Sequence, residues 1–270
     1  MAVSISSLSI ALSQMRTPSG GFDFSVLAKG GGASGGFFSV GSVQVAVQNA
    51  EKNEEKQLAQ IAKDPIVKKD LARYAKVVKE AKTLDDVLDD PVARRVFLKA
   101  NGLGDQVDAV GLAKKALMSD VGDKDGLAAR LASTNGAWLE TAQKFNFKTL
   151  GLTILKVGIK VEEVSNDYIG EKRLDMLDEQ MPGLGSAILF KRIAASLDTP
   201  IKILGSGLGR EVVTTALGLP KQIALQSLEA QSKAISQRLD PKKLKDPDFV
   251  DKLVQRYLIQ LNGGTSGVTA

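Results

Sequence analysis

The segment 201–210 comes nearest to a motif that could bind a ligand. It reads IKILGSGLGR, the order of a strand followed by a glycine-rich turn and a helix, an arrangement that holds phosphate in many proteins. A dinucleotide-binding turn requires glycine where Arg210 stands, and a P-loop requires a Gly-Lys-Ser or Gly-Lys-Thr sequence, which this segment lacks. We therefore interpret the segment as the beginning of a helix and expect no cofactor.

Two acidic stretches, residues 85–90 and 120–126, are the other candidates for chemistry. Residues 120–126, DVGDKDG, resemble a calcium loop, but the first ligand position falls on Val121 and the twelfth on Ala132, and neither side chain offers oxygen. Aspartates at turns and in the first turns of helices explain both stretches without a metal. A carboxylate-based enzyme is the least favoured alternative, and it would need a pocket that gathers several of Asp85, Asp86, Asp89, Asp120 and Asp123.

The absence of two residue types argues most strongly against catalysis. The chain of 270 residues has no His and no Cys, which excludes an imidazole base, a thiolate nucleophile and His- or Cys-ligated zinc. Its 36 basic and 31 acidic residues leave a net charge of only +5, without the basic stripe and interleaved aromatics of a nucleic-acid-binding protein. No apolar run is long enough to span a membrane. We predict a protein that is not an enzyme, binds no nucleic acid and has no membrane-spanning segment.

Helical periodicity dominates from about residue 43 onward. Apolar residues recur at spacings of three and four, and aromatics make up only 5% of the chain, so a mainly α, bundle-like body is expected. Cap signals divide this body into helices: Thr83 begins one, Asp90-Pro91 begins the next, and Asn101-Gly102 ends it. Residues 149–164, TLGLTILKVGIKVEEV, are the one stretch with β character, and we expect at most a short hairpin or an extended segment there.

An internal duplication is indicated by one gap-free alignment. Residues 88–103, LDDPVARRVFLKANGL, match residues 204–219, LGSGLGREVVTTALGL, at six positions. A second, shorter likeness pairs Gln143-Lys144-Phe145 with Gln255-Arg256-Tyr257. The duplication predicts two helical domains, which we place at residues 43–148 and 149–262.

The chain ends differ in composition from this helical body. Residues 1–42 form a Gly- and Ser-rich segment that we expect to be flexible, and residues 263–270 are expected to be a disordered tail. The first fifteen residues carry no charged side chain and lack the positive region of a cleaved secretory signal. Apolar residues within the flexible segment are candidates for binding a partner, because aromatics in a tether tend to dock on a surface. They are Ile5, Leu8, Leu12, Phe22, Phe24, Phe37 and Phe38.

Several stretches of the body resemble a known family. They read LARYAKVVKEAKTLDDVLDD, VFLKANGL and LAARLASTNGAWLETAQKFNF between residues 71 and 147, and ILFKRIA, TTALGLP and LKDPDFVDKLVQRYL farther on. The family is an uncharacterised, mostly alphaproteobacterial group of helical domains of unknown function, often encoded in flagellar gene clusters. The resemblance spans about 200 of the 270 residues but not the first 50, and Asn101 stands where an aromatic is usual. The shared motifs are core and cap residues, so no active site is implied.

The resemblance implies a protein associated with the bacterial flagellum. We expect a structural or assembly component that binds flagellar proteins or copies of itself through helical contacts, with its tails ordering on assembly. The lack of Cys and the uncharged N-terminus fit export to the flagellum without a cleaved signal. The alternative is a cytoplasmic adaptor or chaperone for flagellar export substrates.

Overall fold

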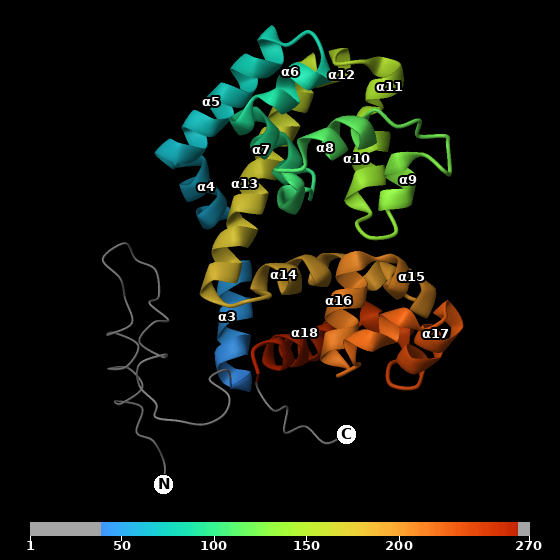
Figure 1. The fold of residues 1–270 in the computed structure, drawn as a ribbon. Helices are drawn as coiled ribbons and strands as arrows, with labels where there is room; N and C mark the ends of the chain where they lie inside the picture. Colours follow the sequence, from blue (N-terminus) through green and yellow to red (C-terminus); the bar gives the residue numbers. More distant parts are fainter. Residues whose placement is uncertain (1–38, 264–270) are drawn as a thin grey trace, which may run out of the picture.

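Helices alone build the described part of the chain, which comprises residues 39–263 of a computed structural model (Figure 1). The mainly α fold is therefore confirmed. The N-terminal half contains α3 (Val40–Lys52), α4 (Glu54–Lys63), α5 (Pro65–Glu80), α6 (Leu84–Asp89), α7 (Pro91–Ala100), α8 (Val110–Leu117), α9 (Leu127–Leu131), α10 (Ala137–Phe145), α11 (Phe147–Leu150) and α12 (Thr153–Lys156). Then follow α13 (Gly158–Gln180), α14 (Leu184–Ile193), α15 (Pro200–Gly205), α16 (Gly207–Ala216), α17 (Leu228–Ser236) and α18 (Pro247–Leu261). Short 3₁₀ turns η1 (Gly104–Gln106), η2 (Ala194–Ser196), η3 (Lys221–Leu225) and η4 (Pro241–Lys245) connect them.

Residues 149–164, where at most a short hairpin or an extended segment was expected, form neither. This stretch forms the end of α11, all of α12 and the beginning of α13, and the described residues contain no strand. Leu152, Leu155 and Val164 are buried in the core, so tertiary packing overrides the β preference of the local sequence. The Gly- and Ser-rich segment expected to reach residue 42 also ends earlier, because Ser39 caps α3 and accepts a hydrogen bond from the Ser42 backbone N–H at 3.2 Å.

Two apolar cores organise the described residues. The first core joins α5 to α12 with the N-terminal half of α13, and we call this unit the first body. The second core joins α14 to α18 with α3 and the C-terminal half of α13, and we call this unit the second body. The grouping differs from the expected ranges 43–148 and 149–262, because the buried side chains of α13 pass from the first core at Tyr168 to the second at Leu177. Figure 1 shows α13 running from one body to the other.

The two bodies repeat the same local structure at a constant interval of 116 residues. Helices α6 and α7 have the lengths and boundaries of α15 and α16 shifted by that interval. Thr83 caps α6 as Thr199 caps α15, and Asp90 caps α7 as Ser206 caps α16, each through its side-chain oxygen. This correspondence extends the alignment of residues 88–103 with residues 204–219, and it supports an origin by duplication.

The ends of α7 and α16 also match in their hydrogen bonds. Gly102 and Gly218 adopt left-handed backbone angles of φ 68° and 61°. The next residue donates back into the helix in both bodies, from the Leu103 N–H to the Leu98 carbonyl at 2.8 Å and from the Leu219 N–H to the Thr214 carbonyl at 2.9 Å. Both are Schellman motifs, so the cap predicted at Asn101-Gly102 is confirmed.

One repeated core position suggests a stabilising substitution. Tyr74 in the first body and Phe190 in the second are fully buried and 116 residues apart. The Tyr74 hydroxyl is buried without a hydrogen-bond partner, and this burial raises the pKa of Tyr74. An unsatisfied buried hydroxyl costs about 1–3 kcal/mol, so we expect Tyr74→Phe to raise the free energy of unfolding by about 1 kcal/mol. Urea unfolding measures the change.

The matched control for that substitution is Tyr257→Phe. The Tyr257 hydroxyl is bonded to Glu211 at 2.7 Å, so its removal is expected to lower stability. A loss of stability on Tyr74→Phe equal to that of the control would contradict the assignment of an unpaired hydroxyl.

Candidate functional site

The predicted partner-binding residues lie outside the described part of the chain. Ile5, Leu8, Leu12, Phe22, Phe24, Phe37 and Phe38 all precede Ser39, so their role stays a prediction.

The acidic residues considered for catalysis or metal binding are engaged in helix caps, turns and ion pairs. Asp86 closes a capping box with Thr83, and Asp85 and Asp89 pair with Lys114 at 3.4 and 2.8 Å. In the other stretch, Asp120 accepts from the Gly122 N–H and pairs with Lys148, while Asp123 accepts from the Asp125 N–H. Within residues 39–263 no group of three or more such side chains is placed to hold a metal ion.

The glycine-rich segment 205–210 serves helix packing. Ser206 caps α16 and accepts a hydrogen bond from the Gly209 N–H at 3.0 Å. A Cβ at Gly209 would lie 2.8 Å from the Leu197 side chain and 3.2 Å from the Ile203 carbonyl oxygen, so glycine lets α15 and α16 approach closely. The interpretation of this segment as a helix start is confirmed.

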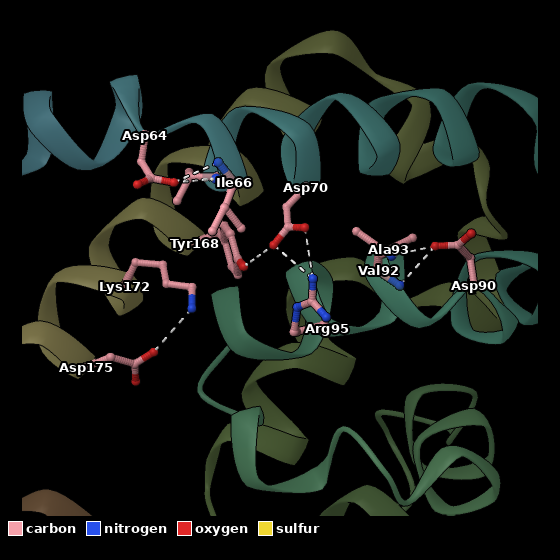
Figure 2. A network of polar contacts seen from close by, with 11 residues as sticks. Asp64, Ile66, Asp70, Asp90, Val92, Ala93, Arg95, Tyr168, Lys172 and Asp175 are labelled. Carbon is pink, nitrogen blue, oxygen red and sulfur yellow. Dashed lines mark hydrogen bonds and ion pairs between the residues drawn. The ribbon is translucent and has the colours of Figure 1, made fainter.

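A polar trio centred on the buried Asp70 holds three helices of the first body together (Figure 2). Asp70 of α5 lies between Arg95 of α7 and Tyr168 of α13. One Arg95 nitrogen donates to both Asp70 oxygens at 2.9 Å, and the Tyr168 hydroxyl donates to Asp70 Oδ2 at 2.8 Å. Burial, followed by the bond to Asp70, raises the pKa of Tyr168 to about 12, so its hydroxyl remains a donor at neutral pH.

The second body contains a counterpart of this trio with different charges. Ser186 and Glu211 lie 116 residues after Asp70 and Arg95, and the buried Tyr257 of α18 takes the place of Tyr168. The Tyr257 hydroxyl donates to Glu211 at 2.7 Å, and Ser186 lies beside it. The structural partner of Tyr257 is therefore Tyr168, and the sequence likeness between Tyr257 and Phe145 does not correspond to a shared position. Phe145 instead stacks on Phe147 in the first core.

A buried arginine fastens the junction of the two bodies. Arg173 of α13 is only 2% exposed. Its guanidinium donates to the Ala50 carbonyl at the end of α3 and to Gln57 Oε1 of α4 at 3.0 Å, and it lies 3.8 Å from Glu54. Burial lowers the pKa of Arg173. Because α3 packs on the second core and α4 packs on α13 and α5, Arg173 fixes the point where the chain passes between the bodies.

A small groove beside Arg173 contains an acid with an unusual pKa. The groove has a volume of about 250 Å³, and Glu171 lines it together with Glu54, Leu58 and Arg192. Burial, and then the charge of Asp175, raises the pKa of Glu171 from its ordinary value of 4.5 to about 7. The folded protein therefore binds a proton at Glu171 over a pH range in which the unfolded chain is ionised.

This shift predicts a pH-dependent gain from Glu171→Gln. Below pH 4.5 both states are protonated and the carboxyl costs nothing; stability is then lost as the pH rises, and the loss is complete above about pH 7. We expect Glu171→Gln to raise the free energy of unfolding by about 2 kcal/mol more at pH 8 than at pH 5. Glu179→Gln, at an exposed position of the same helix, serves as the control. Equal gains at both pH values would rule out the proposed titration.

Two sets of exposed apolar side chains belong to helices that pack against one another. On the first body, Leu150, Val157 and Ile159 lie on and between α11, α12 and α13, and they are 49, 47 and 69% exposed. On the second body, Ile201 belongs to α15, Leu225 to η3 and Leu228 to α17, and they are 53, 88 and 49% exposed. We call the first set the apolar tip and the second set the α15–α17 face. Clustered exposed apolar side chains are typical of binding surfaces.

The trio, the Arg173 contacts and both surfaces escaped the sequence analysis. The trio and the Arg173 contacts join residues 25 to 123 positions apart, which no local pattern indicates. The repeat could have indicated that the two trios correspond. When the alignment is extended beyond residues 88–103 at the same interval of 116 residues, Asp70 aligns with Ser186.

Comparison with known proteins bears on the family and the fold. No curated protein matches the chain. The crystal structure of protein AGR_C_984 from Agrobacterium tumefaciens is similar, with a TM-score of 0.65 and 23% identity over 85% of this chain and 96% of that one. At this identity the likeness shows the fold alone. The model of a family described as "Protein of unknown function (DUF1217)" matches residues 100–250, more than half of the sequence. The resemblance to a family of unknown function is thus confirmed, and the chain belongs to the DUF1217 family.

Proposed function

We propose that this protein is a non-enzymatic structural or assembly component of the bacterial flagellum, and that it acts through helical protein–protein contacts. The flagellar setting rests on the resemblance described for the sequence, and the lack of Cys supports passage through an export channel. The α15–α17 face is the observation that carries the protein-binding role.

Within this face, α17 lacks a cover that its counterpart α8 possesses. In the first body α8 packs on α6, and α9 and α10 then pack on α8. In the second body α17 packs on α15 in the same way, but the chain continues from α17 directly to η4 and α18. Within the described residues, no helices corresponding to α9 and α10 follow α17, and Leu225 is left 88% exposed. A helical segment of a partner protein would bury these side chains as α9 and α10 bury α8.

Localisation tests the proposal and separates it from its alternative. We expect an epitope-tagged copy, expressed from its own locus, to be recovered with purified filaments, hooks or basal bodies. Leu225→Asp is expected to lower this recovery about tenfold, because burying an exposed leucine contributes about 1.5–3 kcal/mol. Ile66→Asp is the matched control, since Ile66 is 71% exposed on α5, away from the face. Purely cytosolic protein bound to unassembled flagellar subunits would favour the cytoplasmic adaptor instead.

A further inference from the structure

We propose that residues 7–13 of the same chain cover the α15–α17 face, by packing on α17 as α9 packs on α8 in the first body. These residues lie outside the described part of the chain. A partner that binds this face would then have to displace them. That last step rests on the proposed function, whereas the packing itself does not depend on a flagellar location.

The repeat shows what is missing beside α17. Leu228 of α17 stands 116 residues after Leu112 of α8. Leu112 is partly buried and packs against the first core, whereas Leu228 is 49% exposed. The exposed leucines of this face do not belong to a membrane-spanning helix, since no described helix is long and apolar enough to cross a membrane. The second body therefore leaves open a position that α9 and α10 cover in the first body.

The helix that lies against α8 has a simple sequence pattern. Leu127 and Leu131 of α9 are four residues apart, so they share one face of the helix, and both pack against the first core. Small residues stand beside them, and one of these, Ala128, is buried. The Ala128 N–H donates to Ser119 Oγ, just beyond the end of α8, at 3.0 Å. Two leucines at a spacing of four, with small residues beside them, thus form the side of α9 that faces the core.

The same pattern occurs near the N-terminus of the chain. Residues 7–13 read SLSIALS, and residues 126–132, which contain α9, read GLAARLA. Leu8 and Leu12 fall on the two leucines of α9, and the small residues on either side of the first leucine and after the second also coincide. The segment carries no charged side chain, so no charge has to be desolvated when it packs on an apolar surface. Its sequence therefore suits the position that α9 occupies in the first body.

The length of the chain lets these residues reach the face. Ser39 caps α3, and α3 packs on α14 and α18 of the second body. About 25 residues separate residue 13 from Ser39 and span about 80 Å when extended, while a body of about 100 residues has a radius of gyration of about 13 Å. The tether holds the segment at an effective concentration of about 1 mM, so even a contact with a dissociation constant near this value is populated.

Paramagnetic broadening of amide signals in the full-length chain tests the packing. The chain has no Cys, so Ala11→Cys provides a single site for a spin label. Residue 11 aligns with Arg130, which is exposed on α9, so the label should not disturb the contact. We expect the label to broaden the signals of α17 strongly and those of α5, in the first body, only weakly.

Four substitutions in the spin-labelled chain show whether the leucines make the contact. Leu8→Asp should lower the ratio of docked to free segment about tenfold, because the burial of a leucine is lost. Leu27→Asp, outside residues 7–13, should leave the broadening unchanged. On the face, Leu228→Asp should act as Leu8→Asp does. Leu150→Asp on the apolar tip is its matched control, because both leucines are 49% exposed.

Three results would overturn the packing. The first is equal broadening of α17 and α5, and the second is an equal loss on Leu8→Asp and Leu27→Asp. The third is broadening that appears only when spin-labelled chains are mixed with isotope-labelled ones, which would assign the segment to a second copy. No flagellar material is used, so a failure here leaves the proposed function standing, and absence of the protein from flagella would leave the packing standing.

Discussion

Arg173→Ala is expected to lower the free energy of unfolding by about 3–5 kcal/mol, the largest effect of any single truncation at the junction of the two bodies. The substitution removes hydrogen bonds from a charged group to the Ala50 carbonyl and to the half-buried Gln57, and the Ala50 carbonyl then remains buried without this donor. It also leaves a void where a long, fully buried side chain was packed. Denaturant unfolding of the full chain measures the loss.

Arg192→Ala is the matched control for this prediction. Arg192 pairs with the same Glu54, but its side chain is 50% exposed, so its removal should cost less than about 1 kcal/mol. Arg173→Lys keeps the charge but cannot reproduce two divergent N–H donors, and we expect an intermediate loss. Similar losses for Arg173→Ala and Arg192→Ala would contradict the fastening role.

Hydrogen exchange can locate the effect of Arg173. Because Arg173 binds the end of α3, its truncation should increase amide exchange in α3 more than in α5, which lies within the first body. Uniform acceleration over both helices would indicate a general loss of stability rather than release of the junction.

Local signals in the sequence predict the helices and their caps well, because those features depend on neighbouring residues. Thr83, Asp90 and Asn101-Gly102 cap helices as expected. The structure of residues 149–164 was not predicted, because it depends on distant residues rather than on neighbouring ones. Its β-branched residues favour a strand locally, but burial of Leu155 and Val164 against other helices decides the outcome.

The buried networks and the exposed surfaces could not be predicted from the sequence, because they depend on contacts between residues far apart in the chain. Asp70 and Tyr168 are 98 residues apart, and nothing around either residue indicates the other. The exposure of Val157 and Ile159 could not be predicted either. Residues of these types are usually found in the core, and only the fold shows that they face outward. The repeat is the one long-range feature that the sequence indicates, because aligning the chain with itself pairs residues that are far apart.

The repeat also predicts that the polar trio of the first body can be exchanged for that of the second. Arg95→Glu alone places a second carboxylate against the buried Asp70, and because the Arg95 side chain is 38% exposed we expect it to lower the free energy of unfolding by about 2–3 kcal/mol. Asp70→Ser alone removes the acceptor of Tyr168 and should cost about 1–2 kcal/mol. The double variant recreates the Ser–Glu–Tyr arrangement found around Tyr257.

The double variant should therefore be more stable than Arg95→Glu alone by about 1–2 kcal/mol, because the introduced carboxylate would accept from the Tyr168 hydroxyl and no longer face a buried aspartate. A double-mutant cycle in urea measures this coupling. Arg73→Glu is the control, because Arg73 pairs with Asp90 between the same two helices but is 49% exposed, and its reversal should cost only about 1 kcal/mol. Additive losses in the cycle would mean that the two trios share positions but not geometry, and the repeat would then extend to the backbone alone.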